Sequence, residues 1–177
     1  MDRARFQHVL DSSRMGDPTA LSMEDLRTRR SELQGVEVTL SYQRRMAQGR
    51  LDIVAAERRR RETGGQPLDP EGIVAQLSEI LAPRTRGPGN GRLAQLLAPD
   101  PDEAETPELD AIAGPDVLAS LTELTDDDLD RLVDALAEFE SECSAARRQL
   151  HERIDQLQAE VVRRYRTGEA TVETLLK

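Results

Sequence analysis

Two long stretches without proline, each opened by the same helix-start signature, constrain the fold of this chain most strongly. The signature LSMEDL at residues 21–26 returns as LTDDDL at residues 124–129, at an offset of 103 residues. Ser22 and Thr125 are favoured helix N-caps, and in both copies an aspartate three residues later can complete a capping box. The chain therefore contains an internal repeat, and each copy begins a helix.

The ends of the two helices are also marked. The first helical pattern runs from about Ser22 to about Thr63, where Gly64 follows, and the second runs from about 124 to the residue before Gly168. Glycine just after a helix readily adopts the left-handed conformation that ends it. Each copy is thus predicted to be one helix of about forty residues, or roughly 60 Å at 1.5 Å per residue.

The composition favours helices that bury a stripe rather than a thick core, because only 2% of the residues are aromatic and 33% are charged. At 100° per residue, each helix carries one narrow apolar seam, which is suited to two-helix coiled-coil pairing. The seams comprise Leu33, Val36, Leu40, Ala47, Leu51 and Val54 in the first helix, and Leu136, Phe139, Cys143, Leu150, Ile154 and Leu157 in the second. The predicted fold class is all-α.

The segment between the two helices is rich in proline and glycine, which predicts loops with one or two short helices rather than a second core. The apolar pieces GIVAQLSEIL and RLAQLLA are the candidate short helices, and the acidic run PDPDEAETPELD is predicted to be solvated linker. The predicted divisions are a mobile arm at 1–21, a long helix at 22–63, an insert at 64–123, a long helix at 124–167 and a tail at 168–177.

Charge and cysteine usage narrow the function classes. A net charge of −10 argues against direct DNA binding and against an anionic membrane surface. The single cysteine, Cys143, is predicted to be a buried small apolar residue. The arginine run at 58–61 is predicted to be a solvated last turn that offsets the helix dipole, with a surface for an acidic patch on a partner protein as the alternative. The first residues lack a signal-peptide core, and we expect a cytoplasmic protein.

A polar stripe beside each apolar seam has the same spacing in both helices. Its members are Glu37, Ser41, Arg44, Gln48 and Asp52 in the first helix, and Glu140, Ser144, Arg147, His151 and Asp155 in the second. On one helix, such a stripe is most often a solvated face laced by ion pairs. Repetition of the serine slot is harder to explain by packing, because serine is a weak helix former.

The side chains in the stripe favour binding over catalysis. An arginine fork fits the O6 and N7 acceptors of guanine, and a carboxylate can accept from the N1 and N2 donors at its other edge. Arg44 with Asp52, and Arg147 with Asp155, are therefore candidate guanine readers. Neither a glycine-rich phosphate loop nor a nucleophile–base pair accompanies them, and the sequence lacks metal-ligand spacings such as His-x3-His. We expect no enzymatic activity and no metal.

The duplicated spacing E-x3-S-x2-R-x3-Q-x3-D resembles that of the RsiG family, the cyclic-di-GMP-dependent anti-sigma factors of sporulating actinomycetes. The resemblance covers both long helices. It implies that the motifs lie on an antiparallel coiled coil and together bind a cyclic-di-GMP dimer. It also implies that the loaded protein sequesters a FliA-type sigma factor, WhiG, and so represses sporulation genes. The first motif is complete, whereas the second has His151 where the family pattern has glutamine.

The residues alone leave the helix orientation open, because an insert of about sixty residues can join parallel or antiparallel helices. The symmetry of a cyclic dinucleotide and the resemblance favour the antiparallel arrangement. That arrangement is expected to place Arg44 near Arg147, Glu37 near Asp155 and Asp52 near Glu140.

Two hypotheses from different classes follow. The first is the nucleotide-dependent anti-sigma factor, and the second is a structural helical-hairpin adaptor with no nucleotide ligand. Ile73, Leu77, Ile80 and Leu81, with the C-terminal TVETLL, are candidate sigma-factor contacts because short amphipathic pieces often dock on another chain. Packing of these pieces on the coiled coil itself is the alternative.

Overall fold

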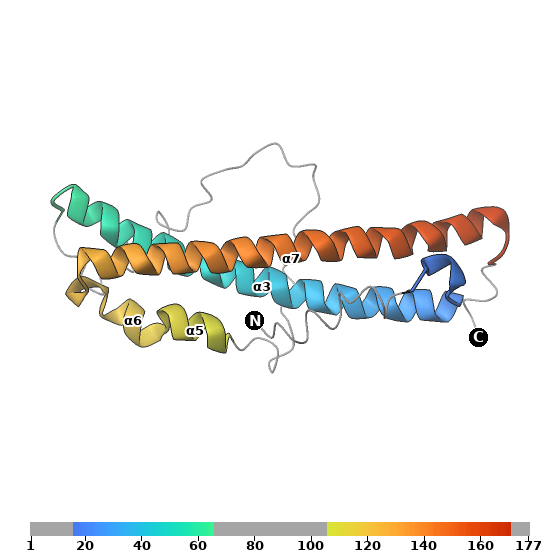
Figure 1. Ribbon diagram of the computed structural model, residues 1–177, viewed down its shortest axis with the longest axis horizontal. Coiled ribbons are helices and arrows are strands. Elements are labelled where there is room, and N and C mark those ends of the chain that lie inside the picture. Colours follow the sequence, from blue (N-terminus) through green and yellow to red (C-terminus); the bar gives the residue numbers. More distant parts are fainter. Residues whose placement is uncertain (1–15, 66–105, 171–177) are drawn as a thin grey trace.

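Two long antiparallel helices form the body of the molecule (Figure 1). The computed structural model describes residues 16–65 and 106–170. In it, α3 (Met23–Glu62) and α7 (Asp126–Thr167) pack against each other. Arg27 at the start of α3 bonds Tyr165 at the end of α7, whereas Arg61 at the end of α3 bonds Asp126 at the start of α7. The predicted all-α antiparallel hairpin is confirmed.

The sequence signals that begin and end the helices act as expected. Ser22 Oγ accepts from the backbone N–H of Asp25 at 3.0 Å, and Thr125 Oγ1 accepts from that of Asp128 at 3.2 Å. Asp128 also reaches back to the backbone N–H of Thr125, which completes a capping box. After each helix a glycine takes a positive φ, +66° at Gly64 and +76° at Gly168.

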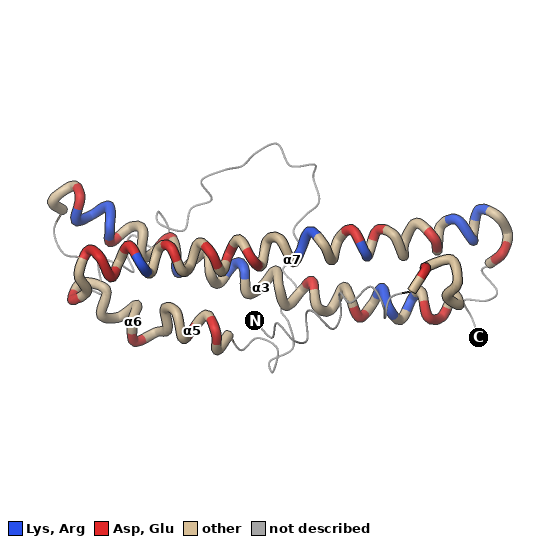
Figure 2. Tube along the Cα trace, viewed as in Figure 1, with Lys and Arg blue, Asp and Glu red and all other residues tan. Residues whose placement is uncertain are grey.

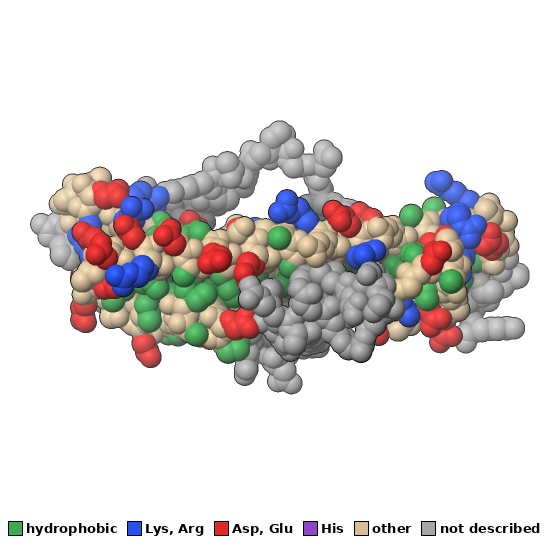
Figure 3. All heavy atoms as spheres, viewed as in Figure 1, with side chains coloured by type: hydrophobic (Ala, Val, Ile, Leu, Met, Phe, Trp, Pro, Cys, Tyr) green, Lys and Arg blue, Asp and Glu red, His purple; other side chains and the backbone are tan. Residues whose placement is uncertain are grey.

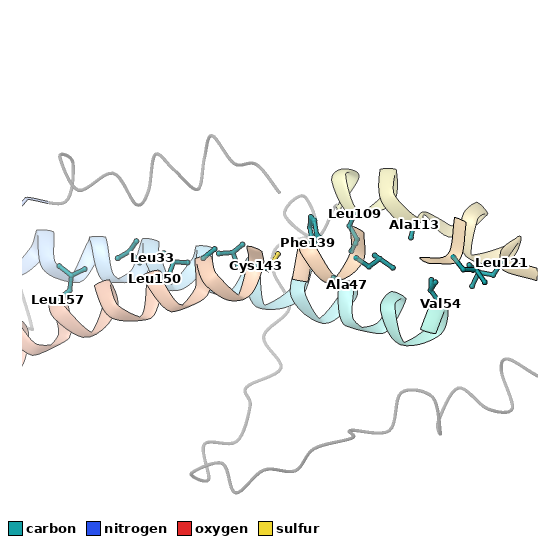
Figure 4. Close-up of a cluster of buried hydrophobic side chains, with 14 of the residues drawn as sticks. Leu33, Ala47, Val54, Leu109, Ala113, Leu121, Phe139, Cys143, Leu150 and Leu157 are labelled. Carbon is teal, nitrogen blue, oxygen red and sulfur yellow. The ribbon is translucent and has the colours of Figure 1, made fainter. Parts of the chain in front are cut away.

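One apolar residue in every seven forms the centre of the coiled coil (Figure 4). None of these ten side chains is more than 2% exposed: Leu26, Leu33, Leu40, Ala47 and Val54 in α3, and Leu129, Leu136, Cys143, Leu150 and Leu157 in α7. The burial of Cys143 is confirmed, and it raises the pKa of the thiol to about 11. This cysteine is therefore an unreactive packing residue at neutral pH.

The α3 seam has a second heptad row, which begins at Val36. This row differs from the predicted apolar seam, because its C-terminal half is polar. Gln43, Arg50 and Glu57 follow one another at heptad spacing and are buried, whereas Val36 and Leu51 are only half-buried. Arg50 and Glu57 tolerate burial because other polar groups satisfy them. Burial of a charged side chain requires such partners.

Arg50 holds a short helical strap against the hairpin. The strap consists of α5 (Pro107–Ala113), α6 (Pro115–Ala119) and the 3₁₀ turn η3 (Leu121–Glu123). The Arg50 guanidinium donates to Asp110 Oδ1 at 2.5 Å and to the carbonyl of Ala113 at 3.1 Å. Figure 3 shows apolar side chains gathered where these short helices meet α7.

The strap corrects one prediction. The acidic run PDPDEAETPELD was expected to be solvated linker, but its last four residues begin α5, and Leu109 is fully buried among the core side chains. The reason is apolar spacing: Leu109, Ile112 and Ala113 form one face of a helical turn that packs on the hairpin. The acidic residues around them masked this pattern.

Several expectations fall outside the described residues. These are most of the arm at 1–21, the candidate helices at 72–81 and 92–98, and the tail from residue 171 onward. The candidate sigma-factor contacts Ile73, Leu77, Ile80 and Leu81 and the TVETLL segment lie there as well.

Candidate functional site

The two polar stripes meet along one edge of the coiled-coil seam. Eight of the ten motif residues form two hydrogen-bonded groups, each with residues from both helices: Glu37, Ser41, Arg147 and His151 in one, and Glu140, Ser144, Arg44 and Gln48 in the other. The structure therefore brings the two motifs together into one surface.

Glu37 of α3 is the centre of the first group. Its Oε1 accepts from Ser41 Oγ at 2.6 Å and from Arg147 Nε at 2.9 Å. His151 Nε2 lies 3.5 Å from the same oxygen. The serine comes from the same helix, one turn on, whereas the arginine and histidine come from α7.

Glu140 of α7 repeats this arrangement in the second group. Its Oε1 accepts from Ser144 Oγ at 2.9 Å, from Arg44 Nη1 at 3.2 Å and from Gln48 Nε2 at 3.3 Å. Each partner of Glu37 lies 103 residues from the equivalent partner of Glu140. The site therefore has a pseudo-two-fold axis.

The pairing across the axis differs in detail from the expectation. Arg44 was expected to lie near Arg147, but each arginine instead forms an ion pair with the opposite glutamate, Arg44 with Glu140 at 3.2 Å and Arg147 with Glu37 at 2.9 Å. The stagger of the two helices brings opposite rather than like charges together, which is the electrostatically favourable register.

The charge state of Glu37 reflects this environment. Burial alone would raise its pKa, but hydrogen bonds from Ser41 and Arg147, together with the nearby Arg147 and His151, outweigh burial and lower the pKa below its ordinary value. Glu37 is therefore a carboxylate at neutral pH, and it positions the Arg147 guanidinium from the opposite helix.

His151 is the only motif residue that departs from the repeat. Its Nε2 lies 3.3 Å from Arg147 Nη2 as well as 3.5 Å from Glu37 Oε1. An unprotonated Nε2 can accept from the arginine, and a protonated one can donate to the glutamate. Gln48, its counterpart in α3, donates to Glu140 in either case.

Asp52 and Asp155 take no part in either group. Within residues 16–65 and 106–170, neither carboxylate has a hydrogen-bond or ion-pair partner, and Asp155 is exposed whereas Asp52 is half-buried. Carboxylates without protein partners at the two ends of a duplicated site are available to accept hydrogen bonds from a ligand.

The two motif arginines also keep unused donors. Their side chains are 26% and 28% exposed, and each spends a single nitrogen on its glutamate. Arg44 Nε is shielded from solvent and has no hydrogen-bond partner. A guanidinium has five N–H donors, so each fork can bind a planar acceptor edge while its glutamate holds it in place.

The structure also shows a duplicated pair of buried glutamates that the sequence reasoning missed. Glu57 accepts from Arg60 and Arg61 near the end of α3, and we call this group the Glu57 clasp. Arg61 then donates to the carbonyls of Leu124 and Leu121, at the turn before α7, at 2.7 and 2.8 Å. The end of one helix is thereby tied to the start of the other.

The second copy forms an equivalent Glu160 clasp at the other end of the hairpin. Glu160 accepts from Arg163 and Arg164, and Arg164 donates to the carbonyl of Thr19 at 2.9 Å. Thr19 lies in the 3₁₀ turn η1 (Pro18–Ala20), which precedes α3. Each member of this clasp lies 103 residues after its counterpart, and that register is the signal that could have found it.

The Glu57 clasp corrects the interpretation of the arginine run at 58–61. A solvated turn was predicted, but Arg60 and Arg61 are largely shielded and paired with Glu57, and Arg58 Nε lies 2.6 Å from Asp130 Oδ1 of α7. Figure 2 shows these basic residues beside the acidic start of α7. Attraction to Glu57 and to the acidic start of α7 explains why Arg60 and Arg61 do not stay solvated, whereas Arg58 and Arg59 remain exposed.

Neither a metal centre nor a membrane span is found in the part of the chain that the structure describes. Residues 16–65 and 106–170 contain no group of three or more metal-ligating His, Cys, Asp or Glu side chains. Among their helices, none is both long and apolar enough to cross a bilayer.

Comparison with protein families gives a match over most of the chain. The family model described as RsiG-like matches residues 12–81 and 115–177, which include both motifs and both clasps. The chain belongs to the RsiG-like family. Comparison with curated proteins gives no match. Membership of the RsiG-like family assigns the chain to a class of regulatory proteins, the anti-sigma factors.

Proposed function

We propose that this protein is a cytoplasmic anti-sigma factor that binds a cyclic-di-GMP dimer and, when loaded, sequesters a FliA/WhiG-type sigma factor to repress sporulation genes. The observation that carries the proposal is the pseudo-two-fold arrangement of the two motifs, in which Glu37 and Glu140 make equivalent contacts. Cyclic-di-GMP is itself two-fold symmetric, so matching half-sites fit its two halves.

Each half-site contains the groups that a guanine and its phosphate require. The Arg44 and Arg147 forks match the O6 and N7 acceptors of guanine. Asp52 and Asp155 can accept from its N1 and N2 donors, since neither carboxylate has a partner within 16–65 or 106–170. The hydroxyls of Ser41 and Ser144, with the side chains at positions 48 and 151, can donate to phosphodiester oxygens.

Sequestration of the sigma factor rests on family membership. If the nucleotide and the sigma factor bind the same loaded form, each strengthens the binding of the other by the same factor, because coupling between two ligands is reciprocal. Direct contact with DNA is not part of the proposal, since a net charge of −10 disfavours binding to a polyanion.

Calorimetry with cyclic-di-GMP tests the proposal directly. The wild-type protein and the double variant Asp52→Ala, Asp155→Ala are titrated with and without a FliA-type sigma factor. We expect two nucleotides per protein and a loss of binding in the variant, because two guanine-edge acceptors are removed at once. The variant should fold normally, because neither aspartate has a structural partner among the described residues.

Absence of binding in both settings would contradict the proposal and leave a helical-hairpin adaptor whose polar stripes are solvated. GTP and cyclic-di-AMP serve as competitor nucleotides. Equal binding of cyclic-di-AMP would show that the aspartates and arginines do not read guanine.

A second prediction concerns the departure from the repeat at His151. If the imidazole donates to a phosphate, affinity should strengthen as the solution is taken from about pH 8 to about pH 6, the range in which imidazole usually gains a proton. The His151→Gln variant restores the repeat and should lack this pH dependence. Identical affinity profiles for the two proteins would show that His151 does not contact the nucleotide.

A further inference from the structure

The hydrogen-bonded surface of the two motifs continues at one end beyond the motif itself. On α3, Arg30 precedes Glu37 by seven residues, and on α7, Gln158 follows His151 by seven residues. Heptad spacing keeps residues on the same side of a coiled coil. Arg30 Nη1 donates to Gln158 Oε1 across the two helices, as Arg147 and Arg44 bond the opposite glutamates.

The other end of the site lacks this pair. In the repeat, the position equivalent to Arg30 is Val133, and the position equivalent to Gln158 is Ala55. Both of these counterparts are half-buried, and Val133 packs against the apolar core. The motif is therefore symmetric, but its immediate flanks are not: one end has a guanidinium and an amide, and the other has two apolar side chains.

Arg30 has donors to spare. Its side chain is half-buried, and its Nε is shielded from solvent without a hydrogen-bond partner. The motif residue Arg44 shares this property on the same heptad row, two heptads further along α3. Among the described residues, Nη1 is the only nitrogen of Arg30 that has a partner, so Nη2 is available to an acceptor supplied by a ligand.

We infer that Arg30, positioned by Gln158, binds an anionic oxygen of the nucleotide and makes the two half-sites unequal. The inference rests on the proposed function and adds a residue to the same site. The ligand group is a phosphodiester oxygen, because the proposed function already assigns the Arg44 and Arg147 forks to the guanines, and a further guanidinium supplies positive charge where the ligand is negative. The half-site next to Arg30 fills first, and the half-site flanked by Val133 and Ala55 fills second.

The test compares two matched arginine substitutions by calorimetry with cyclic-di-GMP at two salt concentrations. Arg30→Gln should weaken the tighter binding step by about tenfold and make affinity less dependent on salt, because a charge-assisted contact is lost. Arg59→Gln removes the same charge from an exposed position on the same helix and should change neither quantity. Circular dichroism checks that both variants remain helical.

A second variant guards against misfolding of the first. Arg30→Val with Gln158→Ala copies onto this end the residues present at the other end, a combination that the hairpin already accommodates. It should make the two binding steps more alike. If wild type binds but both variants behave as Arg59→Gln does, Arg30 is only a packing residue and the inference is wrong. If wild type does not bind cyclic-di-GMP, the proposed function fails and the inference fails with it.

Discussion

The double variant Arg44→Ala, Arg147→Ala is expected to bind cyclic-di-GMP at least about 30-fold more weakly than wild type. A bidentate contact between arginine and guanine contributes roughly 1–3 kcal/mol of discrimination, and two such contacts are removed. The helices should remain intact, because Glu37 keeps its bond from Ser41, and Glu140 keeps its bond from Ser144. Calorimetry measures the affinity, and circular dichroism measures the helix content.

A lysine pair and a neighbouring arginine provide the controls. Arg44→Lys with Arg147→Lys keeps both charges but removes the planar forks, so we expect binding to stay weak. Arg148→Ala removes an exposed charge next to Arg147 and should leave affinity unchanged. Wild-type affinity in the double lysine variant would show that charge alone matters. Wild-type affinity in the Arg44→Ala, Arg147→Ala variant would show that the motif is not the site.

Much of the fold, and the equivalence of the two motifs, could be predicted because both depend on local or periodic signals. The caps at Ser22 and Thr125 and the glycines at 64 and 168 act within one helical turn, and the structure confirms them. The apolar heptad row depends on spacing alone. Internal duplication then made each motif a check on the other.

The contacts between the helices could not be predicted in the same way. Whether Arg44 faces Arg147 or Glu140 depends on the stagger of α3 against α7, and a stagger of a few residues leaves the sequence pattern of each helix unchanged. Burial of Arg50 was equally hidden, because its partners lie in α5, about sixty residues later in the chain. Long-range partners of polar residues leave no periodic signal.

The two clasps are indicated by the internal repeat, although the sequence of either helix alone does not reveal them. Glu57 and Glu160 are almost fully buried charges. The sequence of either helix, considered alone, would predict that they lie on a solvated face. Their arginine partners lie three and four residues later in both copies. Because each clasp ties the end of one helix to the turn before the other, the pair fixes both ends of the hairpin around the two motifs.

Replacing both glutamates, Glu57→Gln and Glu160→Gln, is therefore expected to lower the midpoint of thermal unfolding by about 5–10 °C at neutral pH. Glutamine keeps the size of the side chain but leaves Arg60, Arg61, Arg163 and Arg164 without their carboxylates. Glu62→Gln removes an exposed carboxylate at the end of α3 and should change the midpoint little.

The dependence of this difference on pH provides the sharper test. Hydrogen bonds from Arg163 and Arg164 lower the pKa of Glu160 from 4.5 to about 2, and those from Arg60 and Arg61 lower the pKa of Glu57 despite its burial. A carboxylate with a lowered pKa in the folded state stabilises that state above its unfolded pKa and loses this effect as pH falls. The gap between wild type and the double variant should therefore be largest at neutral pH and shrink from pH 4.5 toward about 2. Chemical denaturation at several pH values measures it, and a gap that stays constant on acidification would show that the clasps stabilise the hairpin by packing rather than by charge.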